Sequence, residues 1–312
     1  MAGAAAARHR GAGSRRAQDG PRPAQDGTPR AAAGCICVNG RLCQPDRAFV
    51  SALDAGFLLG DGLFESLRAS GGAPYLLERH LRRLLEAAAR LQFAHLPSAE
   101  EIRSQVLRTV RRAALPEAYV RITLTRGTGG VGLVPPDGPP TVVVAALPAP
   151  PPVPAGGAIA AALLPRARGP RMAAKSTSWQ SAVVSRRRVQ AGGAAEGLYV
   201  SARGNVLEGV SSNVFAVVDG RLLTPPVRHC LPGVTRARVL ELARAHGLPA
   251  VEAPLSVGVL MSSQEAFVTN AVQGLRALAG IDGAALRRQG ATGVFATMHR
   301  LYARDRTAGG GD

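Results

Sequence analysis

Residues 171–180 read RMAAKSTSWQ, and their fifth residue, Lys175, is the only lysine in a chain of 312 residues. Lysine and arginine together number 38, so arginine occupies the other 37 of these positions. On a solvated surface the two residues are nearly interchangeable, but only the ε-amine of lysine can lose its proton and bond to a carbonyl carbon. The bias towards arginine therefore indicates a chemical need for an amine at position 175. From composition alone, the single lysine at position 175 is explained equally well by the chance survival of a surface lysine.

The stretch lies between a predicted strand at 158–164 and a predicted helix at 179–191. Before it, apolar periodicity and turn residues predict a hairpin at 35–43 with an Asn-Gly turn, a loop and strand at 54–68, helices at 78–91 and 99–114, and strands at 118–126 and 141–146. After it, they predict strands at 197–201, 213–218 and 266–269, and helices at 236–246 and 293–305. This mixture without a βαβ repeat predicts an α+β fold rather than a doubly wound one.

Changes in composition predict the domain organisation. The segment PAPPPVPAGG at 148–157 has the composition of a semi-rigid linker, which separates a smaller domain at 35–147 from a larger one at 158–305. Residues 1–34 are rich in alanine, glycine, proline and arginine without an apolar period, so we expect a disordered tail there. This tail lacks the apolar core of a secretory signal. Residues 306–312 are expected to form a second disordered tail.

The strong positive charge raises the question of a nucleic-acid partner. The formal net charge is +17, but the arginines are scattered and aromatic residues make up only 4% of the chain, so no base-stacking surface is predicted. The sequence also has no apolar run of the roughly 18 residues that a membrane span needs. We therefore expect neither a nucleic-acid nor a membrane partner, and a small anionic substrate suits the charge.

The four cysteines predict a reduced, cytoplasmic protein rather than a metalloprotein. Three of them, Cys35, Cys37 and Cys43, lie close together, but their spacing and the lack of a nearby histidine match zinc sites poorly. We expect no metal site, and free thiols typical of the cytosol. Neither common glycine-rich nucleotide loop occurs in the sequence.

Eight short motifs occur in an order that matches a known family. They are VNG at 38–40, DAGFLLGDGLFESLR at 54–68, HLRRL at 80–84, YVR at 119–121, Lys175, VLEGVSSNVFAV at 206–217, TPPVRHCLPGVTR at 224–236 and TNAVQGLRAL at 269–278. Together they resemble the class IV aminotransferases, which include branched-chain and D-amino-acid aminotransferases and aminodeoxychorismate lyase. The resemblance runs from about residue 38 to residue 301. It implies a two-domain α+β fold with pyridoxal phosphate held between a smaller N-terminal and a larger C-terminal domain, and a homodimer.

The resemblance also implies the residues that bind the cofactor. Lys175 would hold pyridoxal phosphate covalently and move the substrate proton, which a guanidinium cannot do. Glu208 would keep the pyridine nitrogen protonated, so that the ring draws electrons from the substrate. The phosphate would be bound by the residues that match the remaining family positions, namely Arg83, Val234, Thr235, Asn270 and Ala271.

The sequence itself supports only part of this assignment. GVTR at 233–236 precedes a predicted helix, so the N–H groups of Val234 and Thr235 would point at an anion, although a simple helix cap uses the same residues. Helical phase barely separates Arg83 from its neighbour Arg82. An acidic side chain at a strand end, such as Glu208, is also found simply facing solvent.

Three further positions match the substrate side of the family's site. They are Phe64, Tyr119 and Arg121. The last two are two residues apart on a predicted strand and therefore share one face, where Arg121 could meet a substrate carboxylate. Core packing is the alternative for Phe64, and a plain surface position is the alternative for Arg121.

The stretch EAFVTNAVQGLRAL at 265–278 favours the lyase within this family. Lyases carry an asparagine followed by glycine and arginine here, as Asn270, Gly274 and Arg276 do, whereas Ala277 and Trp179 depart from common family residues. Our first prediction is therefore conversion of 4-amino-4-deoxychorismate to 4-aminobenzoate and pyruvate, a step of folate synthesis. The alternative is a branched-chain or D-amino-acid aminotransferase that uses 2-oxoglutarate. A non-enzymatic basic scaffold is the third possibility, which intact Lys175 and Glu208 argue against.

Overall fold

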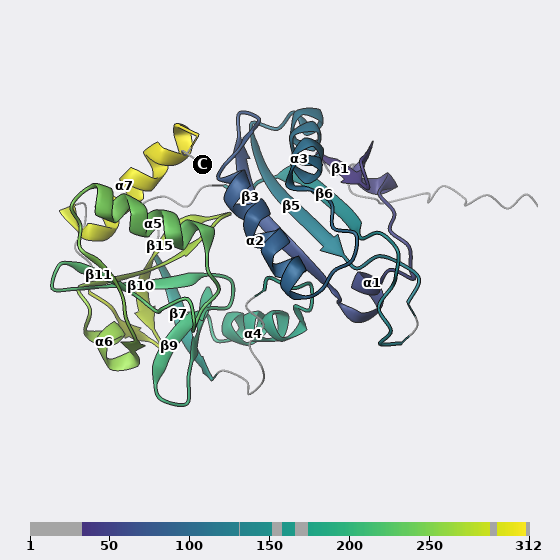
Figure 1. The fold of residues 1–312 in the computed structure, drawn as a ribbon. Coiled ribbons are helices and arrows are strands. Elements are labelled where there is room, and N and C mark those ends of the chain that lie inside the picture. The colour runs from purple at the N-terminus through teal and green to yellow at the C-terminus, as the bar shows by residue number, and fades with distance from the viewer. Residues whose placement is uncertain (1–32, 131, 152–157, 166–173, 288–291, 310–312) are drawn as a thin grey trace, which may run out of the picture. The chain divides into compact units, whose positions relative to one another are not determined.

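The strands form two separate sheets, each with helices packed against it (Figure 1). The computed structural model describes residues 33–130, 132–151, 158–165, 174–287 and 292–309, all within one contact unit of the chain. The tail predicted at 1–34 and the linker predicted at 148–157 lie mostly outside these residues. The division of the rest of the chain into two domains stays a prediction, although the second sheet falls within 158–305 and the first exceeds 35–147 by one residue, Pro148 of β6.

The first sheet has six strands, and all its neighbouring strands are antiparallel. In order across the sheet they are β2 (Arg41–Cys43), β1 (Cys35–Val38), β6 (Thr141–Pro148), β5 (Glu117–Thr125), β3 (Gly62–Ser70) and β4 (Ala73–Pro74). The predicted hairpin is confirmed, since β1 and β2 pair through Asn39 and Gly40. Both turn residues have positive φ, at 48° and 83°, as a tight two-residue hairpin turn requires.

Two amphipathic helices cover this sheet, as their apolar spacing predicts. They are α2 (Leu77–Arg90) and α3 (Ala99–Ala113), and their buried side chains, such as Leu81 and Ile102, join the core formed with β3, β5 and β6. The helix α3 begins with a capping box in which Ser98 Oγ accepts from the Glu101 N–H and Glu101 accepts from the Ser98 N–H.

The short helix α1 (Ala55–Leu59) is missing from the prediction, which expects a loop before β3. Its N-cap Asp54 accepts from the Gly56 N–H at 2.8 Å, and Gly60 ends it with φ at 67°. The aspartate and glycine residues that resemble loop breakers in the sequence are therefore the caps of a five-residue helix.

The second sheet has ten strands and mixes parallel with antiparallel pairs. In order they are β12 (Ala250–Glu252), β11 (Arg221–Thr224), β10 (Asn213–Val218), β14 (Glu265–Asn270), β15 (Gly274–Ile281), β7 (Ala158–Pro165), β8 (Glu196–Val200), β9 (Asn205–Gly209) and β13 (Leu255–Ser256), with β16 (Ala284–Ala285) beside β15. This arrangement confirms mixed sheets rather than a doubly wound fold.

Four helices accompany the second sheet. They are α4 (Gln180–Ala191), α5 (Val234–Ala245), α6 (Val257–Ser262) and α7 (Val294–Thr307). The helices α5 and α7 pack on one apolar cluster of the sheet, and α6 contributes to another. Because α7 continues to Thr307, the first two residues of the tail predicted at 306–312 are helical. None of the helices in the described ranges has the length and apolar character of a membrane span.

One fully buried arginine links the two sheets. Arg68 of β3 is 2% exposed, and its Nε donates to Glu117 of β5 at 2.5 Å. Its Nη1 donates to the carbonyl oxygen of Val272, in the turn between β14 and β15, at 2.9 Å, and its Nη2 donates to that of Pro150 at 2.7 Å. A single guanidinium thus holds three separate segments of the chain together.

We expect Arg68→Met to lower the free energy of unfolding by about 3 kcal/mol, because it removes these hydrogen bonds and the partner of Glu117. Arg68→Lys should recover part of the loss, since an ammonium cannot reach all three acceptors at once. Urea unfolding followed by circular dichroism measures both variants. Equal stability of Arg68→Met and the unchanged protein would contradict this interpretation.

Candidate active site

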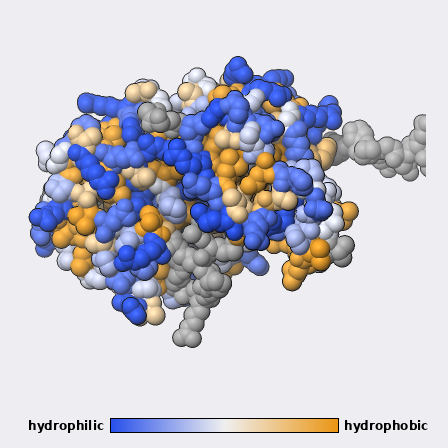
Figure 2. Space-filling view, viewed as in Figure 1, coloured by the Kyte–Doolittle hydropathy of each residue, from blue (hydrophilic) through white to orange (hydrophobic). Residues whose placement is uncertain are grey.

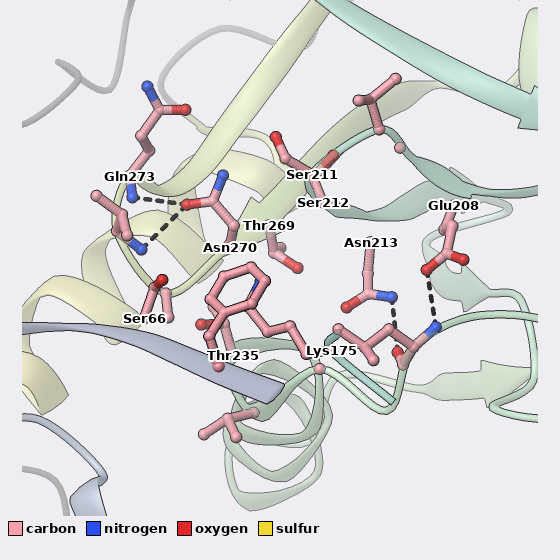
Figure 3. Close-up of a pocket in the computed structure, with 18 of the residues that line it drawn as sticks. Ser66, Lys175, Glu208, Ser211, Ser212, Asn213, Thr235, Thr269, Asn270 and Gln273 are labelled. Carbon is pink, nitrogen blue, oxygen red and sulfur yellow. Dashed lines mark hydrogen bonds between the residues drawn. The ribbon is translucent and has the colours of Figure 1, made fainter. Parts of the chain in front are cut away.

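The ten predicted site residues all line one cavity of about 450 Å³. Figure 3 shows Asn270 and Gln273 on one side of this cavity, Glu208 on the opposite side, and Lys175 between them. Side chains from both sheets contribute, including Phe64 and Tyr119 from the first and Glu208 from the second. The volume is in the range of small-molecule sites.

The position of Lys175 is set by hydrogen bonds to the residues that enter β3. The carbonyl oxygen of Lys175 accepts from the Phe64 N–H at 2.8 Å, and the Thr177 N–H donates to Gly62 at 2.8 Å. The hydroxyl of Thr177 donates to the Gly60 carbonyl at 2.7 Å. As a result, Lys175 Nζ lies 4.4 Å from the centre of the Phe64 ring and 5.2 Å from that of Trp179.

The surroundings of Lys175 make its amine easier to deprotonate. Burial lowers the pKa of Lys175 to about 8, and Arg83 and Arg121 act in the same direction. The carboxylates of Glu65 and Glu208 oppose this shift in part. At pH 7 the neutral amine is therefore about two orders of magnitude more abundant than for a lysine in water. The neutral amine is the form that attacks an aldehyde.

Glu208 is held at the side of the cavity by the loop that enters α5. Its Oε2 accepts from the Leu231 N–H at 2.8 Å. The carbonyl oxygen of Leu231 in turn accepts from Asn213 Nδ2 at 2.9 Å. A carboxylate fixed in this way can accept a hydrogen bond from a protonated ring nitrogen in the cavity.

The N-terminus of α5 opens onto the cavity at Gly233, Val234 and Thr235. Its N-cap residue, Gly233, has no side chain to cap the helix, so the first N–H groups keep their capacity for an anion. Gly233 is required there, because a Cβ on it would lie 2.0 Å from Asn213 Oδ1.

Thr269, which the sequence interpretation missed, also faces the cavity. It is 1% exposed, and its Oγ1 has no hydrogen-bond partner among the described residues. A buried hydroxyl without a partner costs about 1–3 kcal/mol, so this atom marks a place where a bound group would supply an acceptor. Its strand position, one residue before Asn270, is the signal that could have identified it.

The turn that carries Asn270 and Ala271 lies in the cavity wall, and Asn270 shapes the turn itself. Its Oδ1 accepts from the Val272 N–H at 3.1 Å and from the Gln273 N–H at 2.7 Å (Figure 3). This is an asparagine stabilising its own turn, a role that needs no ligand.

The structure distinguishes the two arginines that the sequence left unresolved. Arg83 of α2 lines the cavity, whereas Arg82 is exposed and does not. Arg83 also forms an ion pair with Glu65, a buried residue that the motif analysis passed over together with His80. Both lie within the motifs at 54–68 and 80–84, but a linear motif does not show that Glu65 of β3 pairs with His80 and Arg83 of α2.

Phe64, Tyr119 and Arg121 form a second wall of the cavity. Phe64 is 2% exposed and meets Trp179 edge to face, with ring centres 5.0 Å apart. The guanidinium carbon of Arg121 lies 3.8 Å from the centre of the Phe64 ring, and its Nε donates to Thr123. The Tyr119 hydroxyl lies 3.2 Å from Ser66 Oγ.

The sequence profile of the family described as amino-transferase class IV matches residues 62–281. The chain belongs to this family. The enzymes of the family are pyridoxal-phosphate dependent, and pyridoxal phosphate is the cofactor of this class IV amino-transferase.

Three similar proteins illustrate the range of the family. A Methanocaldococcus jannaschii protein, provisionally named a branched-chain-amino-acid aminotransferase, is 34% identical over 80% of this chain and 88% of its own length. Aminodeoxychorismate lyase of Bacillus subtilis is 30% identical over 76% of this chain and 83% of its own. The structure of a hypothetical aminotransferase from Mycobacterium tuberculosis, in its alpha-ketoglutarate and PMP bound form, has a TM-score of 0.76 at 28% identity and covers 87% of this chain and 100% of its own.

The residues of the cavity fit this cofactor. Lys175 offers a partly buried amine of lowered pKa to the aldehyde. The unpartnered Thr269 hydroxyl and the N-terminus of α5 offer donors to the phosphate, and Glu208 offers an acceptor to the ring nitrogen.

Because Lys175 is the only lysine, its titration can be measured directly. We expect an amine-directed acylating reagent to label Lys175 in the cofactor-free protein with a half-maximal rate at about pH 8. The rate rises as the pH increases through this value, since only the neutral amine reacts. Peptide mass spectrometry separates this site from the N-terminal amine. A midpoint near the pKa of about 10.4 for a lysine in water would contradict the geometry.

Proposed function

We propose that this class IV amino-transferase moves the amino group of an amino acid to 2-oxoglutarate, with branched-chain amino acids as the first candidate donors. The observation that carries the proposal is the 34% identity, over 88% of its length, to the archaeal relative named for that activity. The cavity agrees with it, because Arg121 can bind a carboxylate beside the apolar rings of Phe64 and Trp179.

This proposal reverses the order of the two functions predicted from the sequence, for a physical reason. The lyase prediction depended on Asn270, Gly274 and Arg276. The Asn270 side chain stabilises its own turn, and Arg276 donates to Gln273 at 2.9 Å and is absent from the residues lining the cavity. Asn270 therefore has a structural role that does not depend on the substrate, and the Arg276 contact with Gln273 lies within the same turn. The lyase remains the second candidate, because the Bacillus subtilis enzyme is 30% identical over 83% of its length.

The side chains that line the cavity have the same roles in the aminotransferase and the lyase reaction. When bound, pyridoxal phosphate supplies an aldehyde for the amine and a ring that withdraws electrons. Lys175 Nζ takes the proton from the substrate carbon that bears nitrogen and can return it. Glu208 keeps the ring nitrogen protonated. Arg121 orients a substrate carboxylate, while the buried ring of Phe64 excludes water from that wall.

The two candidate reactions differ in whether they need an acceptor. With pyridoxal phosphate and a branched-chain amino acid, we expect glutamate to form only when 2-oxoglutarate is present. Lys175→Arg, which keeps the charge, should lower this rate at least about 1,000-fold, because it removes the base and the covalent attachment. Chromatography of the products measures the dependence on 2-oxoglutarate and the rate of the Lys175→Arg variant. D-amino acids are tested as donors in the same assay. Pyruvate released from aminodeoxychorismate without a keto acid would instead support the lyase.

We also propose that the protein forms a homodimer through an exposed apolar surface, here called the leucine face. Its side chains come from the segment before β3 and from a loop after β5, and Figure 2 shows hydrophobic residues gathered near the position of α1. They are Phe49, Leu53, Phe57, Leu58, Leu59, Leu133 and Val134. Part of this face lines a second cavity of about 690 Å³ together with Ser176, the neighbour of Lys175. Exposed apolar side chains gathered in this way are typical of a protein interface.

Light scattering coupled to gel filtration tests the dimer. We expect a dimer for the unchanged protein and a monomer for Leu58→Asp, because a carboxylate in the interface would lose its water. Val251→Asp is the control, since Val251 is also exposed, at 45%, but lies on β12. A Leu58→Asp variant that stays dimeric would exclude the leucine face as the interface.

A further inference from the structure

A buried carboxylate lies beside the cavity, on the opposite face of β3 from Phe64. Glu65 is 1% exposed, and three nitrogens lie within hydrogen-bond distance of it. Arg83 Nε donates to its Oε1 at 2.7 Å, Arg83 Nη2 donates to its Oε2 at 2.6 Å, and His80 Nδ1 lies 2.7 Å from Oε2. The first two form the parallel, two-point pair that only arginine can make with a carboxylate.

This pair determines the orientation of Arg83. With Nε and Nη2 turned to Glu65, the remaining nitrogen, Nη1, donates to the carbonyl oxygen of Pro232 at 2.8 Å. Pro232 directly precedes Gly233, the N-cap of α5. Arg83 therefore connects α2 to the entrance of the helix whose first N–H groups face the cavity.

Glu65 also fixes the state of His80. Burial lowers the pKa of the His80 imidazole, so the ring is neutral at pH 7. In the neutral ring, an Nδ1–H that donates to Glu65 leaves the proton off Nε2. His80 lines the cavity and is 1% exposed, so the carboxylate holds one tautomer of a ring in the cavity wall.

The charge of Glu65 reaches Lys175 as well. Burial by itself favours the neutral acid, but Arg83 and His80 outweigh it and lower the pKa of Glu65 to about 2, so the carboxylate is ionised at every pH at which the enzyme would work. This negative charge acts against the burial that lowers the pKa of Lys175, whereas Arg83 acts with it. Glu65 thus balances the positive groups on this side of the cavity.

We propose that Glu65 is a positioning residue that holds Arg83 in place for the cofactor's phosphate and sets the charge around Lys175. It touches neither substrate nor cofactor and acts through these two residues. The proposal rests on the proposed function for the role of Lys175, and on the family resemblance for the assignment of Arg83 to the cofactor's phosphate.

Two measurements on Glu65→Gln test the proposal. In the cofactor-free variant we expect the midpoint for acylation of Lys175 to fall by about half a pH unit or more, because the charge that raises this pKa is lost. We expect the dissociation constant for pyridoxal phosphate, from absorbance titration, to rise about tenfold or more, since an amide accepts only one of the two hydrogen bonds from Arg83. Wild-type values for both would overturn the proposal.

Glu265→Gln is the matched control for the loss of a buried carboxylate. Glu265 is 4% exposed, accepts from the Phe295 N–H at 2.8 Å, and is absent from the residues lining the cavity. It should lower thermal stability without changing either measurement. An equal change in Glu265→Gln would mean that Glu65 acts only through general stability, and would overturn the proposal.

Glu65→Asp separates the positioning of Arg83 from the charge near Lys175. It also provides the test if Glu65→Gln does not fold. The shorter acid keeps the charge but cannot make the same two-point contact, so the cofactor should bind more weakly while the Lys175 midpoint stays near its original value. Unchanged cofactor affinity in this variant would overturn the positioning of Arg83. If the unchanged protein bound no pyridoxal phosphate, the proposed function would fail, while the acylation midpoints would still test the link from Glu65 to Lys175.

Discussion

The amine of Lys175 must be reachable by a substrate and still lose its proton easily, and the rest of the site follows from this requirement. In water a lysine is almost fully protonated at neutral pH. Enclosing the amine beside Phe64 and Trp179 weakens its hold on the proton, and the guanidinium groups of Arg83 and Arg121 act in the same direction. Several positive groups in one cavity repel each other unless carboxylates offset them. Glu65 and Glu208 provide that offset from opposite directions in the fold.

The strand β3 is the element through which these demands are met. It is buried on both faces, so its alternate residues serve two purposes. Phe64 and Ser66 line the cavity, and Glu65 faces α2 and pairs with Arg83. The N–H of Phe64 also binds the carbonyl of Lys175. A shift of β3 by one residue would exchange its two faces, so the register of one strand determines both the lysine and its charged neighbours.

Periodicity and turn chemistry were sufficient for the larger elements. The apolar spacing of α2 and α3, the capping residues Ser98 and Glu101, and the alternation of β5 lead directly to the observed structure. Two elements were missed for different reasons: α1 has only five residues, and the eight-residue strand β15 begins with a glycine and has a second one near its end, which weakens its strand pattern. Such segments form because neighbouring strands pair with them, which a local pattern does not record.

The candidate site divides in the same way. Residues within contiguous motifs, such as Lys175 and Glu208, were found before the structure was known. Glu65, His80 and Thr269 lie in the same motifs, but their roles were not identified, because each role depends on a partner, or a missing partner, from another element. Asn270 shows the opposite failure, since a motif residue that favoured one substrate has a structural role in its own turn. Substrate choice depends on such details and was therefore the weakest inference from the sequence.

The most direct test of this account is covalent trapping of the cofactor. The full-length protein is incubated with pyridoxal phosphate, treated with borohydride to fix any bond between cofactor and amine, digested, and analysed by mass spectrometry. The account predicts one cofactor per chain, attached to the peptide that contains Lys175. No added mass on that peptide, or cofactor found only on the N-terminal amine, would contradict it.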